Sequence, residues 1–208
     1  MSLKALRHGL WILVVVAIVG LGLLLARREA APPAPTAATG DLRPIDGLGG
    51  PFALVDQTGR PFTEASFLGK PTALFFGYTF CPDVCPTTLL EVETWMKELG
   101  PDADRLRVVF VTVDPERDTP EKLATYLSSF DPRFLGLSGP RAEIDRAIKA
   151  WRVYARKVDN PSGAYTMDHT AAVYLLDAQG RFVGIVNFQE PTERAMIKIR
   201  RLVGKAAS

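Results

Sequence analysis

Apolar residues along the C-terminal three quarters of the chain follow two alternating patterns. Continuous apolar runs such as "PTALFFGY" (71–78) and "LRVVFVTV" (106–113) are typical of strands buried on both faces of a sheet. Between these runs, apolar residues recur at helical spacing, at Leu89, Val92, Met96 and Leu99. Gly100-Pro101 predicts the end of that helix. The pattern therefore predicts strands that alternate with helices.

The remaining elements continue this alternation. Thr119-Pro120-Glu121 supplies an N-cap, a first-position proline and a first-turn acid, which predicts a helix through about Ser128. We also expect a short hairpin from Phe52 with its turn in "DQTGRPF", a strand at 134–139, an amphipathic helix at 142–153, a hairpin over "TAAVYLLDAQGRFVGIVN" and a final helix at about 191–203. Periodicity alone predicts an α/β sandwich with a mixed central sheet. The order also matches a thioredoxin-like fold with an added N-terminal β-hairpin.

The N-terminal region has a different character. After a short basic tail, residues 1–9, residues 10–26 carry no charge and predict one transmembrane helix. Two arginines follow without an Ala-x-Ala motif, which favours an uncleaved anchor, with a cleaved signal peptide as the alternative. Residues 27–44 are rich in Ala, Pro and Thr and predict a semi-extended linker. The folded domain is therefore expected at residues 45–208.

The order of the segments predicts the cellular location, and the charge restricts the class of partner. A short N-terminal tail before a large domain favours a single-pass protein of the bacterial inner membrane with the C-terminal domain in the periplasm. The chain has a formal net charge of +2, of which four basic residues and one acid before residue 30 contribute +3. The remainder is at −1 and lacks the basic field that nucleic acids require. Nucleic-acid binding is therefore excluded as an expected function.

The two cysteines of the chain lie close together, in "FCPDVCP" (80–86). A residue before proline is pushed out of the α region, so we expect Cys81 and Cys85 to be extended, with Cys85 near an N-cap and Pro86 first in the helix. The helix dipole would then favour thiolate at Cys85. A purely structural disulfide closing so short a ring contributes only about 2 kcal/mol. A redox pair and a metal site are the stronger interpretations.

A metal site needs a third ligand. The chain has two histidines, and His8 flanks the predicted membrane segment. His169 lies just before a predicted buried strand, in "TMDHTAAVYLL", and we expect the preceding segment "KVDNPSGAYTM" to be a compact loop. Two thiolates and one imidazole form a soft, low-coordinate set suited to copper, including Cu(I). Structural zinc prefers four ligands, so copper is the better choice.

Four separated segments resemble the Sco/SenC family of membrane-anchored copper proteins: "GYTFCPDVCPTTL", "VTVDPERDTPEKL", "FLGLSG" and "MDHTAAVYLLDAQGRFV". The resemblance extends from Gly50 to Asn187 and implies a thioredoxin-like fold that binds copper as Cu(I) or Cu(II). It carries the metal ligands over to Cys81, Cys85 and His169. It also implies a metallochaperone rather than an enzyme, with cytochrome c oxidase subunit II, at its binuclear copper centre, and a copper donor protein as partners.

Three further residues are candidates for a supporting role. Asp114 occupies the family's acidic position, where it either holds the copper loop and modulates affinity or simply forms a turn before Pro115. Asp168 either orients His169 or is an exposed loop acid. Met167 offers a thioether, for which packing is the favoured role.

Two other functions use the same cysteines. A thiol–disulfide reductase that keeps the acceptor's cysteines reduced needs only Cys81 and Cys85. A copper-dependent redox sensor follows if metal loading and disulfide formation compete for the same sulfurs. A monomer is expected in each case.

Overall fold

The computed structural model describes residues 19–20, 42–159 and 163–205. Most of the predicted anchor and linker therefore lies outside the described residues. Within those ranges, no helix combines the length and apolar character needed to cross a membrane. A compact unit begins at Leu42, whose side chain is buried in the core.

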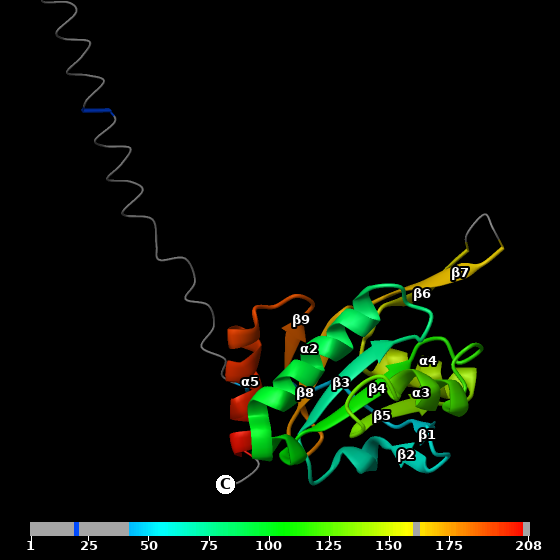
Figure 1. The fold of residues 1–208 in the computed structure, drawn as a ribbon, viewed down its shortest axis with the longest axis horizontal. Helices are drawn as coiled ribbons and strands as arrows, with labels where there is room; N and C mark the ends of the chain where they lie inside the picture. The colour runs from blue at the N-terminus through cyan, green and yellow to red at the C-terminus, as the bar shows by residue number, and fades with distance from the viewer. Residues whose placement is uncertain (1–18, 21–41, 160–162, 206–208) are drawn as a thin grey trace, which may run out of the picture. The chain divides into compact units, whose positions relative to one another are not determined.

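A seven-stranded mixed sheet forms the centre of this unit, with the strand order β2-β1-β5-β4-β3-β8-β9 (Figure 1). Strands β3, β4 and β5 run parallel, and the strands beside them join antiparallel, which confirms the predicted mixed sheet. The strands are β1 (Ala53–Asp56), β2 (Pro61–Thr63), β3 (Thr72–Gly77), β4 (Arg107–Thr112), β5 (Phe134–Ser138), β8 (Ala172–Leu176) and β9 (Phe182–Asn187). The first two form the predicted N-terminal hairpin.

Helices lie where the apolar spacing predicts them. They are α2 (Val84–Leu99), α3 (Pro120–Leu127), α4 (Arg141–Ala150) and α5 (Thr192–Lys205), with short 3-10 helices η1 (Glu64–Phe67) and η2 (Gly100–Arg105). Helix α2 packs beside α5, and α3 packs along β5 (Figure 1). The Thr119 hydroxyl accepts the Lys122 amide at 3.4 Å, which confirms the predicted cap of α3.

The core explains the continuous apolar runs. Every residue of β3 is buried, and β4 is buried after its first residue, because helices cover both faces of a parallel sheet. Large side chains complete this core, including Trp95 of α2 and Trp151, which directly follows α4.

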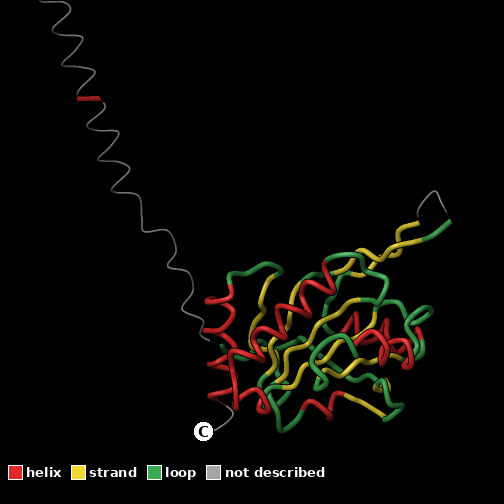
Figure 2. The backbone as a smooth tube through the Cα atoms, viewed as in Figure 1, coloured by secondary structure: helices red, strands yellow, loops and turns green. Residues whose placement is uncertain are grey.

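One element differs from the sequence prediction. The segment "KVDNPSGAYTM", expected as a compact loop, contributes to the antiparallel strands β6 (Ala155–Asp159) and β7 (Tyr165–His169). They form a separate two-stranded sheet that extends away from the seven-stranded one (Figures 1 and 2). The loop prediction was wrong because β6 exposes most of its side chains and so shows no apolar run.

Candidate metal centre

The cysteine loop connects β3 to α2. Cys81 lies in the loop and is partly exposed, whereas Cys85 is fully buried in the first turn of α2. The prediction of an extended Cys85 next to a first-position Pro86 was wrong, because α2 already begins at Val84. Pro86 is tolerated as the third helical residue because the first four helical amides have no intrahelical partner. The helix therefore fixes Cys85, while Cys81 depends on the loop.

His169 is the last residue of β7 and faces the cysteines. Its Nε2 lies 3.3 Å from the Cys85 sulfur, and its Nδ1 lies 3.1 Å from the carbonyl oxygen of Thr170. A proton on Nδ1 that is donated to this carbonyl leaves the Nε2 lone pair for a ligand. The two sulfurs and a ring nitrogen all lie within 4.8 Å of one another. The fold thus brings together the three residues that the sequence selected.

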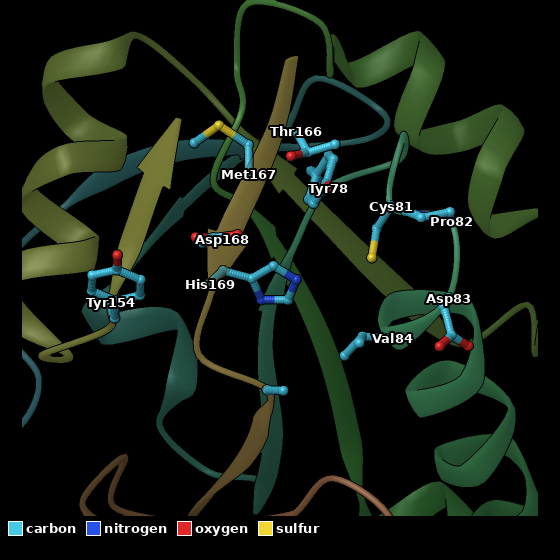
Figure 3. Close-up of a pocket in the computed structure, with 11 residues that line it drawn as sticks. Tyr78, Cys81, Pro82, Asp83, Val84, Tyr154, Thr166, Met167, Asp168 and His169 are labelled. Atoms are coloured by element: carbon cyan, nitrogen blue, oxygen red, sulfur yellow. The ribbon is translucent and has the colours of Figure 1, made fainter. Parts of the chain in front are cut away.

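Cys81 and His169 line a pocket of about 510 Å³, whereas Cys85 is buried and does not line it. Figure 3 shows the Cys81 sulfur and the His169 ring pointing into the same space, with Tyr154 at one side. The rings of Phe75 and Tyr78 pack edge-on against the imidazole, with centroids 6.0 and 5.8 Å away. Cys81 and His169 are therefore reachable from solvent, and aromatic rings pack against the imidazole.

The two thiols differ in their acidity. Hydrogen bonds from the Cys85 side chain and from the amides of Cys85 and Asp83, with a further one from His169 when its Nε2 carries a proton, lower the pKa of Cys81 to about 4, against the opposing effect of burial. The Cys85 amide donates to the Cys81 sulfur at 3.4 Å. The pKa of Cys85 is raised, because its thiol proton is held by the Cys81 thiolate and because it is buried. At neutral pH the pair is a thiolate and a thiol.

The acid that holds the cysteine loop is Asp118, which the sequence analysis did not single out. Its buried carboxylate accepts the amide and hydroxyl of Thr79 at 3.0 and 2.6 Å, and the hydroxyl of Thr112 at 2.7 Å. Burial raises the pKa of Asp118, although these hydrogen bonds oppose the shift. The available signal was a second aspartate in "VDPERD", after the carboxyl end of a buried strand.

Asp114 is also buried but serves a different segment. Its carboxylate accepts the Tyr165 hydroxyl at 2.9 Å and pairs with Arg117. Its carbonyl accepts the amides of Arg117 and Asp118 in a turn, at 3.1 and 3.0 Å. Asp114 thus holds β7 rather than the cysteine loop, and it lies outside the ligand cluster.

The alternation of side chains along β7 shows that Asp168 does not orient His169. Tyr165, Met167 and His169 share the inner face of β7, and Thr166 and Asp168 face outward. The Asp168 carboxylate pairs with Arg156 at 3.2 Å, while the His169 Nδ1 is placed against the Thr170 carbonyl. Asp168 therefore takes its alternative place as an exposed acid, and Met167 packs into the core.

Fold and site together define a thioredoxin-like α/β domain. Near the carboxyl end of its central strand β3, two cysteines and a histidine are arranged to bind one soft metal ion. The family model described as SCO1/SenC matches residues 41–204. The chain belongs to this family.

Named relatives agree with this assignment. "Protein SCO1, mitochondrial" of Saccharomyces cerevisiae is 41% identical over 150 residues, which cover 70% of this chain and 51% of that protein. The structure of Bradyrhizobium japonicum ScoI with copper bound is 52% identical, with a TM-score of 0.70 over 74% of this chain and 99% of that one. Yeast Sco1 with copper bound is 38% identical, with a TM-score of 0.70 over 76% and 89%. The chain spans about half the length of the curated yeast relatives.

Proposed function

We propose that this chain is a membrane-tethered copper metallochaperone that delivers copper to the binuclear centre of cytochrome c oxidase subunit II. The observation that carries the proposal is the convergence of Cys81, Cys85 and His169 within 4.8 Å. Two similar solved structures, ScoI and Sco1, have copper bound. Sulfur and imidazole ligands of this kind favour copper over hard cations.

The ligand set suits loading followed by release. Cys81 is ready as a thiolate, and copper binding displaces the proton of Cys85, so loading releases protons. Cys85 and His169 are held by different elements, α2 and β7. His169 can therefore leave the metal while both sulfurs stay in place, which opens a position for an acceptor thiolate.

Copper titration of variants tests the ligand assignment. The reduced domain from residue 42 is expected to bind one copper with a sulfur-to-copper charge-transfer band. Cys81→Ser and Cys85→Ser should lose the band, and His169→Ala should shift it and weaken binding. Asp159→Ala, an exposed acid on β6 of the same hairpin that does not line the pocket, is the matched control and should bind as the wild type does. Unchanged stoichiometry and spectra in the three ligand variants would defeat the assignment.

The membrane tether is part of the same proposal and is supported by the uncharged residues 10–26. Anchoring a copper domain beside a membrane-bound acceptor raises their effective concentration. The full chain should stay in bacterial inner membranes after alkaline extraction, with its C-terminal domain accessible to protease from the periplasm. Extraction into the soluble fraction would contradict the anchor while leaving copper binding unaffected. Light scattering of the domain tests the expected monomer.

A second function, thiol–disulfide reduction of the acceptor, is favoured by the low pKa of Cys81. The Cys81 thiolate would attack an acceptor disulfide, and Cys85 would then resolve the mixed disulfide, leaving two acceptor thiols and an oxidised pair here. His169→Ala separates the two functions, since it should impair copper delivery and spare reduction. A copper-dependent redox sensor would instead show copper protecting both thiols from oxidation.

A further inference from the structure

The strand that carries His169 is not part of the main sheet. Strands β6 and β7 pair with each other and form a sheet of their own. Next to these strands, the Thr170 amide donates to the Tyr154 carbonyl, and the Tyr154 amide donates to the Thr170 hydroxyl, each at 2.9 Å. His169 is joined to the main sheet by the short segment that leads into β8, and its distance from the cysteines also depends on side-chain contacts that join β7 to the body of the domain.

Arg117 makes such contacts on the hairpin side. Its Nη1 donates to the Tyr165 carbonyl at 3.0 Å, and its guanidinium lies 3.6 Å from the centroid of the Tyr165 ring. Asp114 pairs with the guanidinium and also accepts the Tyr165 hydroxyl. Tyr165 is thus held at its backbone, its ring face and its hydroxyl, four residues before His169 on the same face of the strand.

The same guanidinium also contacts the chain that leads into the cysteines. It lies 4.6 Å from the Phe80 ring and 5.7 Å from the Tyr78 ring, and Phe80 directly precedes Cys81. The Tyr78 ring in turn packs against the imidazole. The Arg117 side chain is only 20% exposed, and its Nη2 is buried without a hydrogen-bond partner among the described residues. Aromatic faces therefore supply much of its environment, where cation–π attraction is strongest.

We infer that Arg117 is a positioning residue that sets the approach of His169 to the two sulfurs, by joining the β7 strand to the Tyr78–Phe80 segment. The contacts that support this inference are present without copper, and its effect on copper binding rests on the proposed function. A planar guanidinium can donate hydrogen bonds in its plane while its face stacks on an aromatic ring, whereas a lysine ammonium has no planar face to stack. Loss of the Arg117 contacts is expected to let β7 move and to separate the imidazole from Cys85.

The first test uses reduced, copper-free protein. Nuclear Overhauser contacts between the His169 and Tyr78 rings should weaken in Arg117→Lys and Arg117→Ala, together with faster amide exchange in β7. Arg156→Ala is the matched control, because Arg156 is on the same hairpin in an exposed ion pair. It should leave the ring contact unchanged. An intact ring contact in Arg117→Lys, or an equal loss in Arg156→Ala, overturns the inference.

The second test asks whether Arg117 acts through His169. Arg117→Lys should lower Cu(I) affinity about tenfold in the wild type, the size of coupling usual between residues in contact, but less than about twofold in a His169→Ala background. Equal losses in both backgrounds would show a general structural role and contradict the inference. If the wild type binds no copper, the proposed function is wrong. The contact between the His169 and Tyr78 rings in copper-free protein still tests this inference separately. Arg117→Lys retains the charge beside buried Asp114, which guards against simple unfolding.

Discussion

Thr79 and Asp118 are joined by two hydrogen bonds, from the Thr79 amide at 3.0 Å and from its hydroxyl at 2.6 Å, to a carboxylate buried between β4 and α3. Thr79 lies two residues before Cys81, so these hydrogen bonds join the cysteine loop to the turn that follows β4. The geometry of the thiols thus depends on an acid that never touches them.

Removal of that acid should loosen the loop and destabilise the fold. Asp118→Ala leaves one buried donor, at Thr112, and two partly buried donors, at Thr79, without their acceptor, for which we expect a loss of about 2–4 kcal/mol in the free energy of unfolding. Asp104→Ala, which removes one exposed ion pair with Arg133, should cost less than about 1 kcal/mol. Urea denaturation of both variants measures the difference, and similar losses in the two would contradict the assigned role.

The reactivity of Cys81 should persist into acid. Its pKa of about 4 lies below that of a free thiol, so the thiolate stabilises the folded state above the free-thiol pKa. This contribution is lost as pH falls through about 4. The alkylation rate of Cys81, followed by mass spectrometry, should fall in the same range.

Cys85→Ala supplies the control for this pH profile. It removes the thiol whose hydrogen bond is the largest cause of the low pKa and leaves no side-chain donor in its place, so the inflection should move upward. A profile centred at the free-thiol value in the wild type would contradict the predicted thiolate.

Gly77 provides space for the buried sulfur. A Cβ at this position would lie 2.7 Å from the Cys85 sulfur and 2.7 Å from the Phe110 ring. Gly77→Ala should therefore displace Cys85, lower copper affinity and cost about 1–3 kcal/mol through overpacking. Gly204→Ala is the matched control, because nothing lies within 4 Å of a Cβ there. Its unfolding free energy should stay within about 1 kcal/mol of the wild type. Equal effects of the two substitutions would refute the steric argument.

Copper removal should lower stability by mass action. At free Cu(I) one hundred times the dissociation constant, binding to the folded state alone adds about 2.7 kcal/mol. A Cu(I) chelator should abolish this increment in urea unfolding, and Cys85→Ser protein should show no increment at any copper level. An increment that survives in Cys85→Ser would indicate that copper binds elsewhere.

Local sequence patterns predicted most of the main sheet and its helices. The runs that became β3 and β4 are buried by helices and by neighbouring strands, so their burial is visible as continuous apolar sequence. The β6–β7 hairpin was missed because its stability comes from a few inner-face contacts, such as those of Tyr165 and Met167, rather than from a run of apolar residues.

The ligand set was predictable because thiols and imidazoles are scarce in this chain and chemically distinctive. Supporting residues were not, because several acids in "VDPERD" and "MDH" look equivalent as sequence. Only the register of β7 shows that Asp168 points outward, and only the turn after β4 separates the roles of Asp114 and Asp118.

The separate hairpin has a consequence for how such a protein can diverge. Its outward side chains, Thr166 and Asp168, border the copper pocket without belonging to the core of the domain. Mutations at these two positions can change the surface beside the pocket while Cys81, Cys85 and His169 stay in place. Under the proposed function, evolution can therefore change which acceptor the domain recognises without changing its metal ligands.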